Sequence, residues 1–328
     1  MPTPLRIVTF NLENFDDTGT TAPTLADRIA IMRPQMLRLR ADVLCLQEVN
    51  SQEVAGVRTF SALDALLAGT PYAAFNRVHT TLAGPSTVPL VERNLVILSR
   101  FQVSAPDEIK HTIVPRPAYR RVTASPADTV AIDITWERPI LKAAITLPTG
   151  ATLHVLNLHL KSKLPTDIPG QHPSQFVWSS ASGLAEGSFV SSVKRVGQAL
   201  ETRVVIDQIF TADANAHIVC CGDFNADVDE VPLEAIRGDV ENTGNPDLIG
   251  RVMVPIERTI PSSSRFSLYH HGRGVMLDHI LASRAMLAFW QGTEIHNEIL
   301  HDESIAFATD RKFPESDHAP VIAEFLLP

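Results

Sequence analysis

The sequence predicts an α/β protein built around a mixed β-sheet. Short apolar or alternating runs rich in Val, Ile and Leu are typical of strands, and they recur along the whole chain. Longer stretches between them, such as residues 189–210, repeat their apolar residues near the spacing of an α-helix. Pro148-Thr149-Gly150 separates two strand-like runs and is typical of a hairpin turn. A hairpin implies antiparallel pairing, which argues against a purely parallel sheet.

Strands and helices are expected in the following order. We expect strands at residues 5–10, 42–47, 94–99, 130–136, 140–147, 152–160, 217–221, 276–281 and 321–326, and helices at residues 25–40, 60–68 and 189–210. Pro34 is expected to kink the first helix, because proline lacks a backbone N–H. Residues 164–188 and 254–274 are rich in Pro, Gly and Ser without a clean period, so we expect surface loops near a site.

Composition limits the class of protein. A chain of 328 residues with 45% apolar composition can bury a large core without disulfides. The cysteines Cys45, Cys220 and Cys221 are odd in number and lie in apolar runs, which favours reduced core thiols. The N-terminus lacks the features of a signal peptide, and no apolar run is long enough to span a membrane. We therefore expect a cytoplasmic protein with no membrane partner, whose oligomeric state the sequence leaves open.

The net charge of −9 argues against a broad basic surface of the kind that holds nucleic acid through many phosphate contacts. It does not exclude a nuclease, because bound metal ions supply positive charge locally.

Gly222-Asp223-Phe224-Asn225 directly follows the apolar run 217–221 and is therefore expected at the end of a strand. Because strand side chains alternate, Asp223 and Asn225 should point the same way and present an acid and an amide together. A simple turn cap would explain the same residues. The motif becomes informative only alongside others.

Further polar residues follow other strands. Asp317 and His318 precede the last strand and offer an oxygen ligand beside a proton-transfer group, although an exposed turn is the alternative. Glu48 and Asn11 end the second and first strands. Asp278 lies within a strand that should otherwise be buried, where it is a site residue or a member of a core ion pair.

Asn157, His159 and Lys161 alternate onto one face of an apolar strand. Polar groups at alternate positions of a buried strand are costly without partners, so we expect them to face a polar cavity.

Seven short motifs together resemble the endonuclease/exonuclease/phosphatase superfamily, which has the deoxyribonuclease I-like fold. They are Thr-Phe-Asn-Leu-Glu-Asn (9–14), Gln-Glu-Val (47–49), Ile-Leu-Ser-Arg (97–100), Asn-Leu-His-Leu-Lys (157–161), Gly-Asp-Phe-Asn (222–225), Leu-Asp-His-Ile (277–280) and Ser-Asp-His-Ala-Pro-Val (316–321). The resemblance covers residues 5–326. It implies a four-layer α/β/β/α sandwich with two mixed, largely antiparallel β-sheets, formed by one domain over residues 1–328.

The resemblance also implies a metal site. Glu48 would be the principal Mg²⁺ ligand, with Asn11 and Asp317 completing or sharing the metal environment through oxygen atoms. Mn²⁺ is a possible substitute. The reaction would be in-line attack of water on phosphorus.

Six residues are expected to act in catalysis: His159, Asp223, Asn225, Asp278, His318 and Glu92. Asp223 would orient or deprotonate the attacking water and Asn225 would hydrogen-bond the substrate, as the resemblance implies. The two histidines would contact phosphate oxygens or move protons, His318 with Asp278 and His159 with Glu92 as acid partners. Whether the base is Asp223 or a His–Asp pair is left open.

The expected substrate is a phosphate ester, either in nucleic acid or in a smaller molecule. We favour a Mg²⁺-dependent endo- or exonuclease acting on DNA or RNA. A phosphatase or phosphodiesterase acting on a small or lipid-like substrate is the alternative, and an inactive binding module on the same fold is the non-enzymatic one. Asn157, Lys161 and Arg120 are the candidate substrate-binding residues, Arg120 because it lies among local cationic groups near Tyr119.

Other hydrolase classes fit the sequence poorly. Consecutive residues such as Ser316, Asp317 and His318 cannot form a serine-hydrolase triad, and the chain has no Gly-x-Ser-x-Gly motif. His296 and His301 are five residues apart, whereas the histidines of a zinc-protease helix are four apart. A phosphate-binding P-loop motif is also absent from the sequence.

Overall fold

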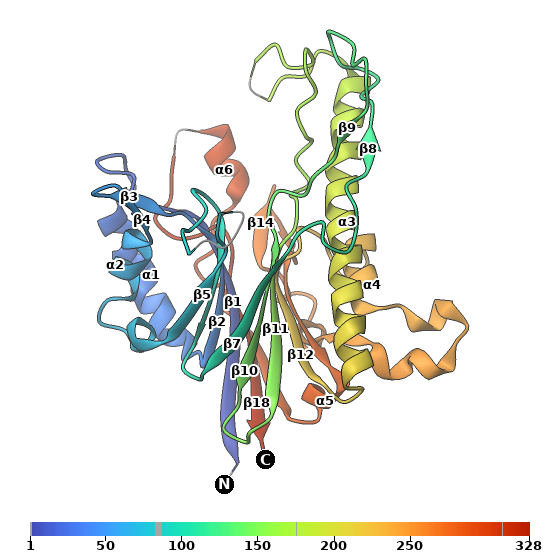
Figure 1. The fold of residues 1–328 in the computed structure, drawn as a ribbon. Helices are drawn as coiled ribbons and strands as arrows, with labels where there is room; N and C mark the ends of the chain where they lie inside the picture. The colour runs from blue at the N-terminus through green and yellow to red at the C-terminus, as the bar shows by residue number, and fades with distance from the viewer. Residues whose placement is uncertain (1, 83–86, 175, 310) are drawn as a thin grey trace.

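Two six-stranded β-sheets pack face to face, and helices cover the outer face of each sheet (Figure 1). The computed structural model describes residues 2–82, 87–174, 176–309 and 311–328. Apolar side chains of both sheets, including Ile7, Val155 and Ile280, form the core between them. The expected four-layer α/β/β/α sandwich is confirmed.

The first sheet has the strand order β17-β18-β1-β2-β6-β5. Within it β1 and β2 are parallel, whereas the other neighbours are antiparallel. Its strands are β1 (Thr3–Phe15), β2 (Val43–Val49), β5 (Asn76–His79), β6 (Asn94–Ser99), β17 (Trp290–Ile295) and β18 (Val321–Leu327).

The second sheet has the order β13-β16-β12-β11-β10-β7, and only the β11–β12 pair is parallel. Its strands are β7 (Val103–Ile109), β10 (Ile140–Thr146), β11 (Thr152–His159), β12 (His217–Asp223), β13 (Met253–Pro255) and β16 (Asp278–Ser283). The predicted hairpin joins β10 to β11, where Gly150 has φ of 84°. That left-handed conformation favours glycine.

The helices form the two outer layers. α1 (Leu25–Leu39) and α2 (Ser61–Leu67) pack on the first sheet, and α3 (Ala181–Ala212) and α4 (Val231–Arg237) pack on the second. α1 begins in a capping box formed by Thr24 and Asp27, and Pro34 lies within it. None of the described helices combines the length and the apolar character that a membrane crossing requires.

Short elements complete the chain. They are the helices α5 (Arg284–Leu287) and α6 (Glu303–Ala308), the strand pairs β3 (Gln52–Val54) with β4 (Val57–Thr59), β8 (Ala118–Tyr119) with β9 (Ile132–Asp133) and β14 (Leu268–His270) with β15 (Arg273–Val275), and the 3₁₀ helices η1 (Pro71–Ala74), η2 (Val240–Thr243), η3 (Pro246–Arg251) and η4 (Ile256–Thr259). Cys45, Cys220 and Cys221 are free and buried.

Three predicted segments were wrong in part. Residues 130–136 contain only the two-residue β9, because this segment leaves the sheets and follows α3. The predicted loop 164–188 ends early, since α3 begins at Ala181, where Ser180 accepts a hydrogen bond from Gly183 N. Residue 175 lies outside the described residues. The predicted loop 254–274 contains η4 and β14.

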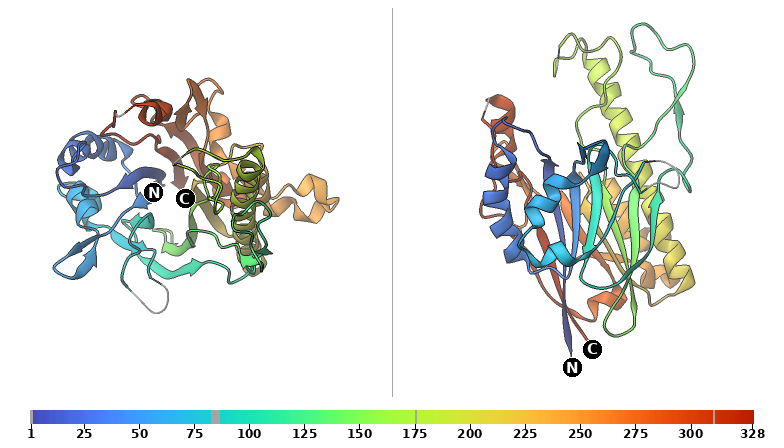
Figure 2. Two further views of the ribbon diagram at one scale, coloured as in Figure 1. Left: turned by 90° about the horizontal axis from the view of Figure 1, so that it is seen from above. Right: turned by 60° about the vertical axis from the view of Figure 1, so that its left-hand side comes forward.

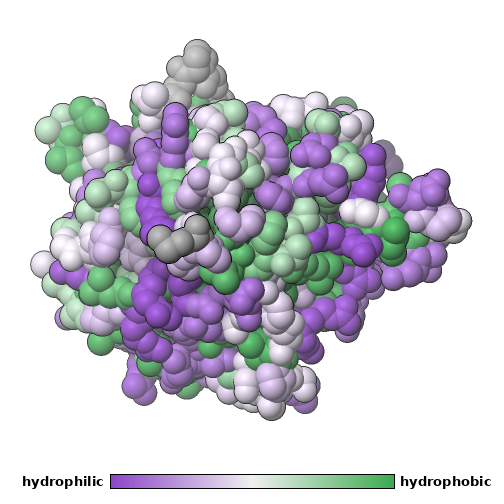
Figure 3. Space-filling view, turned by 90° about the horizontal axis from the view of Figure 1, so that it is seen from below, coloured by the Kyte–Doolittle hydropathy of each residue, from purple (hydrophilic) through white to green (hydrophobic). Residues whose placement is uncertain are grey.

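α3 rises beyond the sandwich at the end opposite the chain termini (Figures 1 and 2). Two acidic side chains fasten the neighbouring loops to this helix. Glu186 accepts hydrogen bonds from Tyr119 Oη and Thr123 N, and Glu201 accepts them from Ile113 N and Trp136 Nε1. On the face seen from below, hydrophilic and hydrophobic residues are interspersed (Figure 3).

Candidate active site

A cleft of about 630 Å³ opens among the strand ends and the loops that follow them. Charged and polar groups from both sheets line it: Glu13, Asn14, Glu48, Arg93, Arg138, His159, Ser162, Lys163, Asp223, Asn225, His270, His301, Glu303, Lys312, Asp317 and His318. The two sheets thus contribute to a single site.

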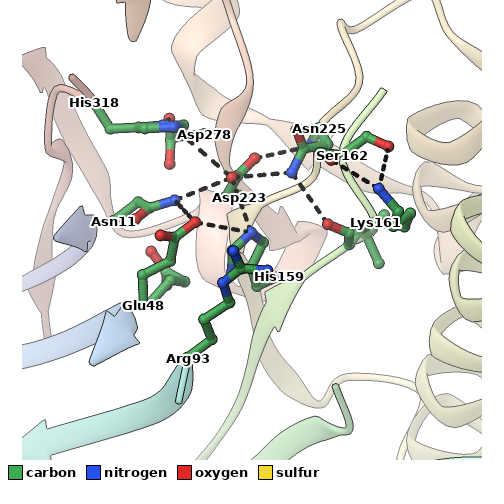
Figure 4. Close-up of polar contacts among 12 residues, drawn as sticks. Asn11, Glu48, Arg93, His159, Lys161, Ser162, Asp223, Asn225, Asp278 and His318 are labelled. Atoms are coloured by element: carbon green, nitrogen blue, oxygen red, sulfur yellow. Dashed lines mark hydrogen bonds and ion pairs between the residues drawn. The ribbon is translucent and has the colours of Figure 1, made fainter. Parts of the chain in front are cut away.

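The Asp223 carboxylate lies at the centre of this site (Figure 4). Its Oδ2 atom accepts hydrogen bonds from Asn11 Nδ2 and Asn225 Nδ2, each at 3.1 Å. Two imidazoles face the same oxygen, with His159 Nε2 at 3.4 Å and His318 Nε2 at 3.9 Å. The side chains of Asp223 and Asn225 therefore lie together on one side of the site, as predicted.

Strand register explains why these residues meet. Asp223 is paired with His159 on β11 and with Asp278 on β16. The pairing with β11 requires glycine at position 222, because Gly222 has φ of 138° and a Cβ atom there would collide with Leu158 O. The glycine of the motif thus allows β12 to approach its neighbour.

Burial raises the pKa of Asp223 to about 7, although the charge of His318 opposes the change. The charges of Asp278 and Glu48 add to the increase. A carboxylate with a pKa near neutrality is suited to accept a proton at physiological pH.

His318 forms a close buried pair with Asp278. The distance between His318 Nδ1 and Asp278 Oδ2 is 2.6 Å. Burial alone would lower the pKa of His318, but the charge of Asp278 and the hydrogen bond to it raise this pKa well above the ordinary value. The imidazole is therefore positively charged, with Nε2 directed to Asp223.

His159 has the opposite character. Its pKa is lowered well below the ordinary value by burial and then by the charge of Arg138, so the ring is neutral. Its Nε2 atom lies 3.5 Å from Glu48 Oε1, and its buried Nδ1 atom has no hydrogen-bond partner among the described residues. The predicted pairing with Glu92 does not occur. Glu92 is exposed, because the turn before β6 directs it to solvent.

The expected metal ligands fit a hard cation in part. Among the described residues, no three His, Cys, Asp or Glu side chains form a group able to hold a metal ion. Mg²⁺ often takes only one or two protein carboxylates and keeps several waters. Glu48 lines the cleft, and Asp317 Oδ1 is buried without a hydrogen-bond partner in the described part of the chain. Burial also raises the pKa of Asp317 to about 6, so an added cation would stabilise both carboxylates.

Asn11 is oriented differently from the prediction. Its Oδ1 atom accepts a hydrogen bond from Glu13 N, and its Nδ2 atom donates to Glu48 Oε1 at 3.4 Å as well as to Asp223. In this arrangement Asn11 is a hydrogen-bond donor that links the two carboxylates. It would offer oxygen to a metal only after rotation of its amide.

The three predicted substrate-binding residues do not line the cleft. Asn157 is fully buried between the sheets, where Nδ2 donates to Leu46 O and Val96 O and Oδ1 accepts from Gln47 Nε2. Asn157 was expected to face a polar cavity, but its side chain lies in the interface between the two sheets. Lys161 donates to Ser162 Oγ and Leu164 O and fastens a loop.

Arg120 is exposed and directly follows β8, which lies beside the raised part of α3. Its position follows from the path of residues 111–136 along this helix, away from the sheet ends.

The cleft also contains residues that were not predicted as site residues, among them Arg138 and Glu13. Arg138 Nη1 donates to His159 O at 3.4 Å, and its buried Nε atom has no partner among the described residues. Burial and the charge of Asp317 raise the pKa of Glu13 to about 8. Arg138 lies between two strand-like runs, and nothing in the sequence shows that its side chain is buried at a site.

Comparisons with known proteins agree with this fold. The model of the Endonuclease/Exonuclease/phosphatase family matches residues 8–318. Among solved structures, a humanized D. rerio TDP2 has a TM-score of 0.56 at 15% identity, covering 98% of both chains. An AP endonuclease from Archaeoglobus fulgidus has a TM-score of 0.50 at 16% identity, covering 98% of this chain and 99% of the other. A search of curated protein sequences finds no significant match.

The chain belongs to the Endonuclease/Exonuclease/phosphatase family. Members of this family are phosphoric ester hydrolases, which supports a hydrolase of the phosphodiesterase or nuclease type.

Proposed function

We propose that the chain is a Mg²⁺-dependent hydrolase that cleaves phosphodiester bonds in nucleic acid, with one domain containing the whole site. The observation that carries this proposal is the set of contacts around Asp223. This buried carboxylate accepts hydrogen bonds from two amide groups and faces two imidazoles, of which His159 is neutral and His318 is positively charged. Titratable groups whose environments separate their pKa values are typical of paired acid and base roles.

Asp223 is the proposed base. It orients the attacking water and takes its proton, as its pKa of about 7 permits. Asn225 Nδ2 donates to Asp223 Oδ2 and to Leu160 O, and exchanging one of these acceptors for a phosphate oxygen would let it bind the substrate. Asp223 ends β12 and Asn225 follows it, so both are placed by the register of β12 with β11.

The charged His318 donates a hydrogen bond to the phosphate or a proton to the leaving oxygen. Asp278 holds the ring through Nδ1, which leaves Nε2 for this contact. The neutral His159 can either accept or donate at Nε2. Because His318 is already protonated, Asp223 is favoured over the His318–Asp278 pair as the base.

Glu48 and Asp317 would hold the Mg²⁺ ion, with Asn11 fixing the position of Glu48. When bound, the ion supplies positive charge for the phosphate oxygens. Arg138 contributes further positive charge from the other wall of the cleft.

A nucleic-acid strand is the proposed substrate. D. rerio TDP2, whose fold this chain shares at 16% identity, has been solved with a single-strand DNA product. The net charge of −9 and the cleft volume of about 630 Å³ also suit a small phosphodiester, which is the second candidate.

A substrate panel tests the proposal. Bis-p-nitrophenyl phosphate, single- and double-stranded DNA, RNA, phosphomonoesters and inositol phosphates are assayed with Mg²⁺, with Mn²⁺ and with chelator. We expect chelator-sensitive cleavage of the nucleic acids, and loss of cleavage in Asp223→Asn. A preference for phosphomonoesters or inositol phosphates would overturn the proposal of a nuclease. Inactivity on every substrate would favour an inactive binding module on the same fold.

Glu48→Gln tests the metal role separately. The substitution keeps the shape of the side chain and removes its charge, so the Mg²⁺ concentration at half-maximal activity should rise about tenfold or more. The control is Glu53→Gln, which changes an exposed acid of β3 that pairs with Arg58 of β4. It should leave the Mg²⁺ concentration at half-maximal activity unchanged. A Glu48→Gln titration that matches the wild type would remove Glu48 from the metal site.

A further inference from the structure

A group of cationic side chains lies between the cleft and α3. Lys194 and Arg195 project from α3, Arg138 precedes β10, Lys161 follows β11, and Lys110 follows β7. We call these five residues the cationic cluster. Figure 4 shows Lys161 on the side of the site next to a helix. The cluster reaches the cleft at Arg138, which lines it.

One residue, Glu137, contacts three of these cations, two of them through its carboxylate. Lys194 Nζ lies 3.5 Å from Glu137 Oε1, and Arg138 Nη1 lies 3.9 Å from Glu137 Oε2. Lys110 Nζ donates to the backbone oxygen of Glu137 at 3.1 Å. Both carboxylate contacts are longer than a good charge-assisted hydrogen bond.

The other two cations bind neutral oxygens. Lys161 Nζ donates to Ser162 Oγ at 2.9 Å, and Arg195 Nη1 donates to Lys161 O and Ser162 O, each at 3.0 Å. Within the described part of the chain, neither Lys161 nor Arg195 lies in ion-pairing distance of a carboxylate. Buried Arg138 also keeps an unpartnered Nε atom. Much of the cluster's positive charge is therefore not neutralised.

This excess charge is costly in the free protein. Burial lowers the pKa of Lys110 and of Lys161, and the charges of neighbouring cations, including Lys194 and Arg138, lower it further. The Glu137 charge opposes these effects. An anion placed among these groups would remove the repulsion, so the cluster is prepared for a negatively charged ligand.

We propose that the cationic cluster is a second phosphate subsite, which holds a phosphate group of the substrate other than the one that is cleaved. This inference rests on the proposed function. The shared chemistry is a phosphate group, either the next phosphodiester along a strand or a terminal phosphate. The subsite also explains how a chain with a net charge of −9 could hold a polyanion, because Arg138 of the cleft lining is accompanied by four further cations beside it.

The test compares substrates that share one scissile bond. A thymidine dinucleotide, the same dinucleotide with a 5′-phosphate or a 3′-phosphate, and the trinucleotide are assayed with the Mg²⁺-loaded protein. We expect an added phosphate to lower KM, and Lys194→Gln to reduce that advantage about tenfold, as for loss of one charge-assisted hydrogen bond. An effect in the trinucleotide identifies a strand phosphate. An effect only in the phosphorylated dinucleotides identifies a terminal phosphate.

Matched variants separate the subsite from general charge effects. Lys142→Gln removes a cation of β10 that is paired with Asp107 at 4.0 Å, and it should leave the advantage intact. Lys194→Arg should restore it. Glu137→Gln removes the opposing carboxylate and should increase the advantage, an effect opposite in sign to that of Lys194→Gln.

Calorimetric titration with pyrophosphate measures binding at the subsite independently of substrate turnover. Lys194→Gln should weaken pyrophosphate binding about tenfold and Lys142→Gln should not. Equal binding by the wild type and Lys194→Gln, or equal KM values with and without the added phosphate, would overturn the subsite while leaving the hydrolase intact. Absence of all hydrolysis, together with cluster-dependent pyrophosphate binding, would overturn the proposed function and leave the subsite.

Discussion

Two buried histidine–carboxylate pairs start from consecutive residues of β16. Asp278 pairs with His318, and His279 pairs with Glu257, each with a nitrogen–oxygen distance of 2.6 Å. Because neighbouring residues of a strand point to opposite faces, one pair faces the cleft and the other faces away from it.

The pairs differ in what the second ring nitrogen meets. His279 Nε2 donates to Ala226 O at 2.8 Å, so both of its nitrogens are satisfied and the ring is fully buried. His318 Nε2 lies 3.9 Å from both Asp223 and Asp317 and borders the cleft. The same chemical pair is thus structural where it is closed and available for chemistry where one nitrogen remains open.

The largest expected effect is on turnover. His318→Ala should lower kcat by about 10²–10⁴, the usual contribution of general acid–base catalysis. The measurement is Mg²⁺-dependent hydrolysis of bis-p-nitrophenyl phosphate, with circular dichroism to verify the fold. A folded variant with wild-type kcat would contradict the role of the open pair.

The closed pair should instead determine stability. His279→Leu leaves the Glu257 carboxylate buried without its partner, which should lower the free energy of unfolding by about 3–5 kcal/mol. The double variant His279→Leu/Glu257→Leu should recover most of this loss, because no unpaired charge remains. Urea denaturation of the three proteins measures both changes. A double variant as unstable as the single one would show that the pair is not an isolated unit.

Asn157 extends the comparison to a polar residue that was expected to bind substrate. Asn157→Leu removes the hydrogen bonds that Asn157 makes with Leu46 O, Val96 O and Gln47 Nε2 between the sheets, so the free energy of unfolding should fall by about 2 kcal/mol. Gln47 Nε2 keeps Thr9 Oγ1 and Cys45 O as acceptors. KM for a dinucleotide should not change. A large increase in KM with unchanged stability would restore Asn157 to the substrate site.

The smallest effect concerns pH. The pKa of His279 is raised above its ordinary value of 6.5 because the Glu257 charge and hydrogen bond outweigh burial. Its stabilisation is therefore complete below pH 6.5 and is lost as pH rises through the folded-state pKa. The stability difference between the wild type and the double leucine variant should shrink by at most about 1.4 kcal/mol per pH unit over that range. A difference that grows with pH would contradict the charged state of His279.

Much of the fold was predictable because local patterns decide local structure. The apolar runs before Asp223 and around Ile280 became β12 and β16, and the Pro148-Thr149-Gly150 turn joined β10 to β11. The prediction of a strand at residues 130–136 was wrong because the alternation of apolar residues there reflects packing beside α3 and not pairing in a sheet. The predicted start of this helix at residue 189 was too late, because the first turns of α3 contain Gly183 and Gly187, which weaken a helical pattern.

The sequence by itself determined that Glu48, His159 and Asp223 lie at or next to the ends of strands and that His318 precedes one. Asn11 was expected to end the first strand, but β1 continues to Phe15. Only the tertiary structure decided how they pair. The partners of His159 are Glu48 and Asp223 instead of Glu92, and Asn11 acts as a donor to two carboxylates. Distances between residues far apart in the chain depend on strand register and on sheet packing, which no local pattern contains.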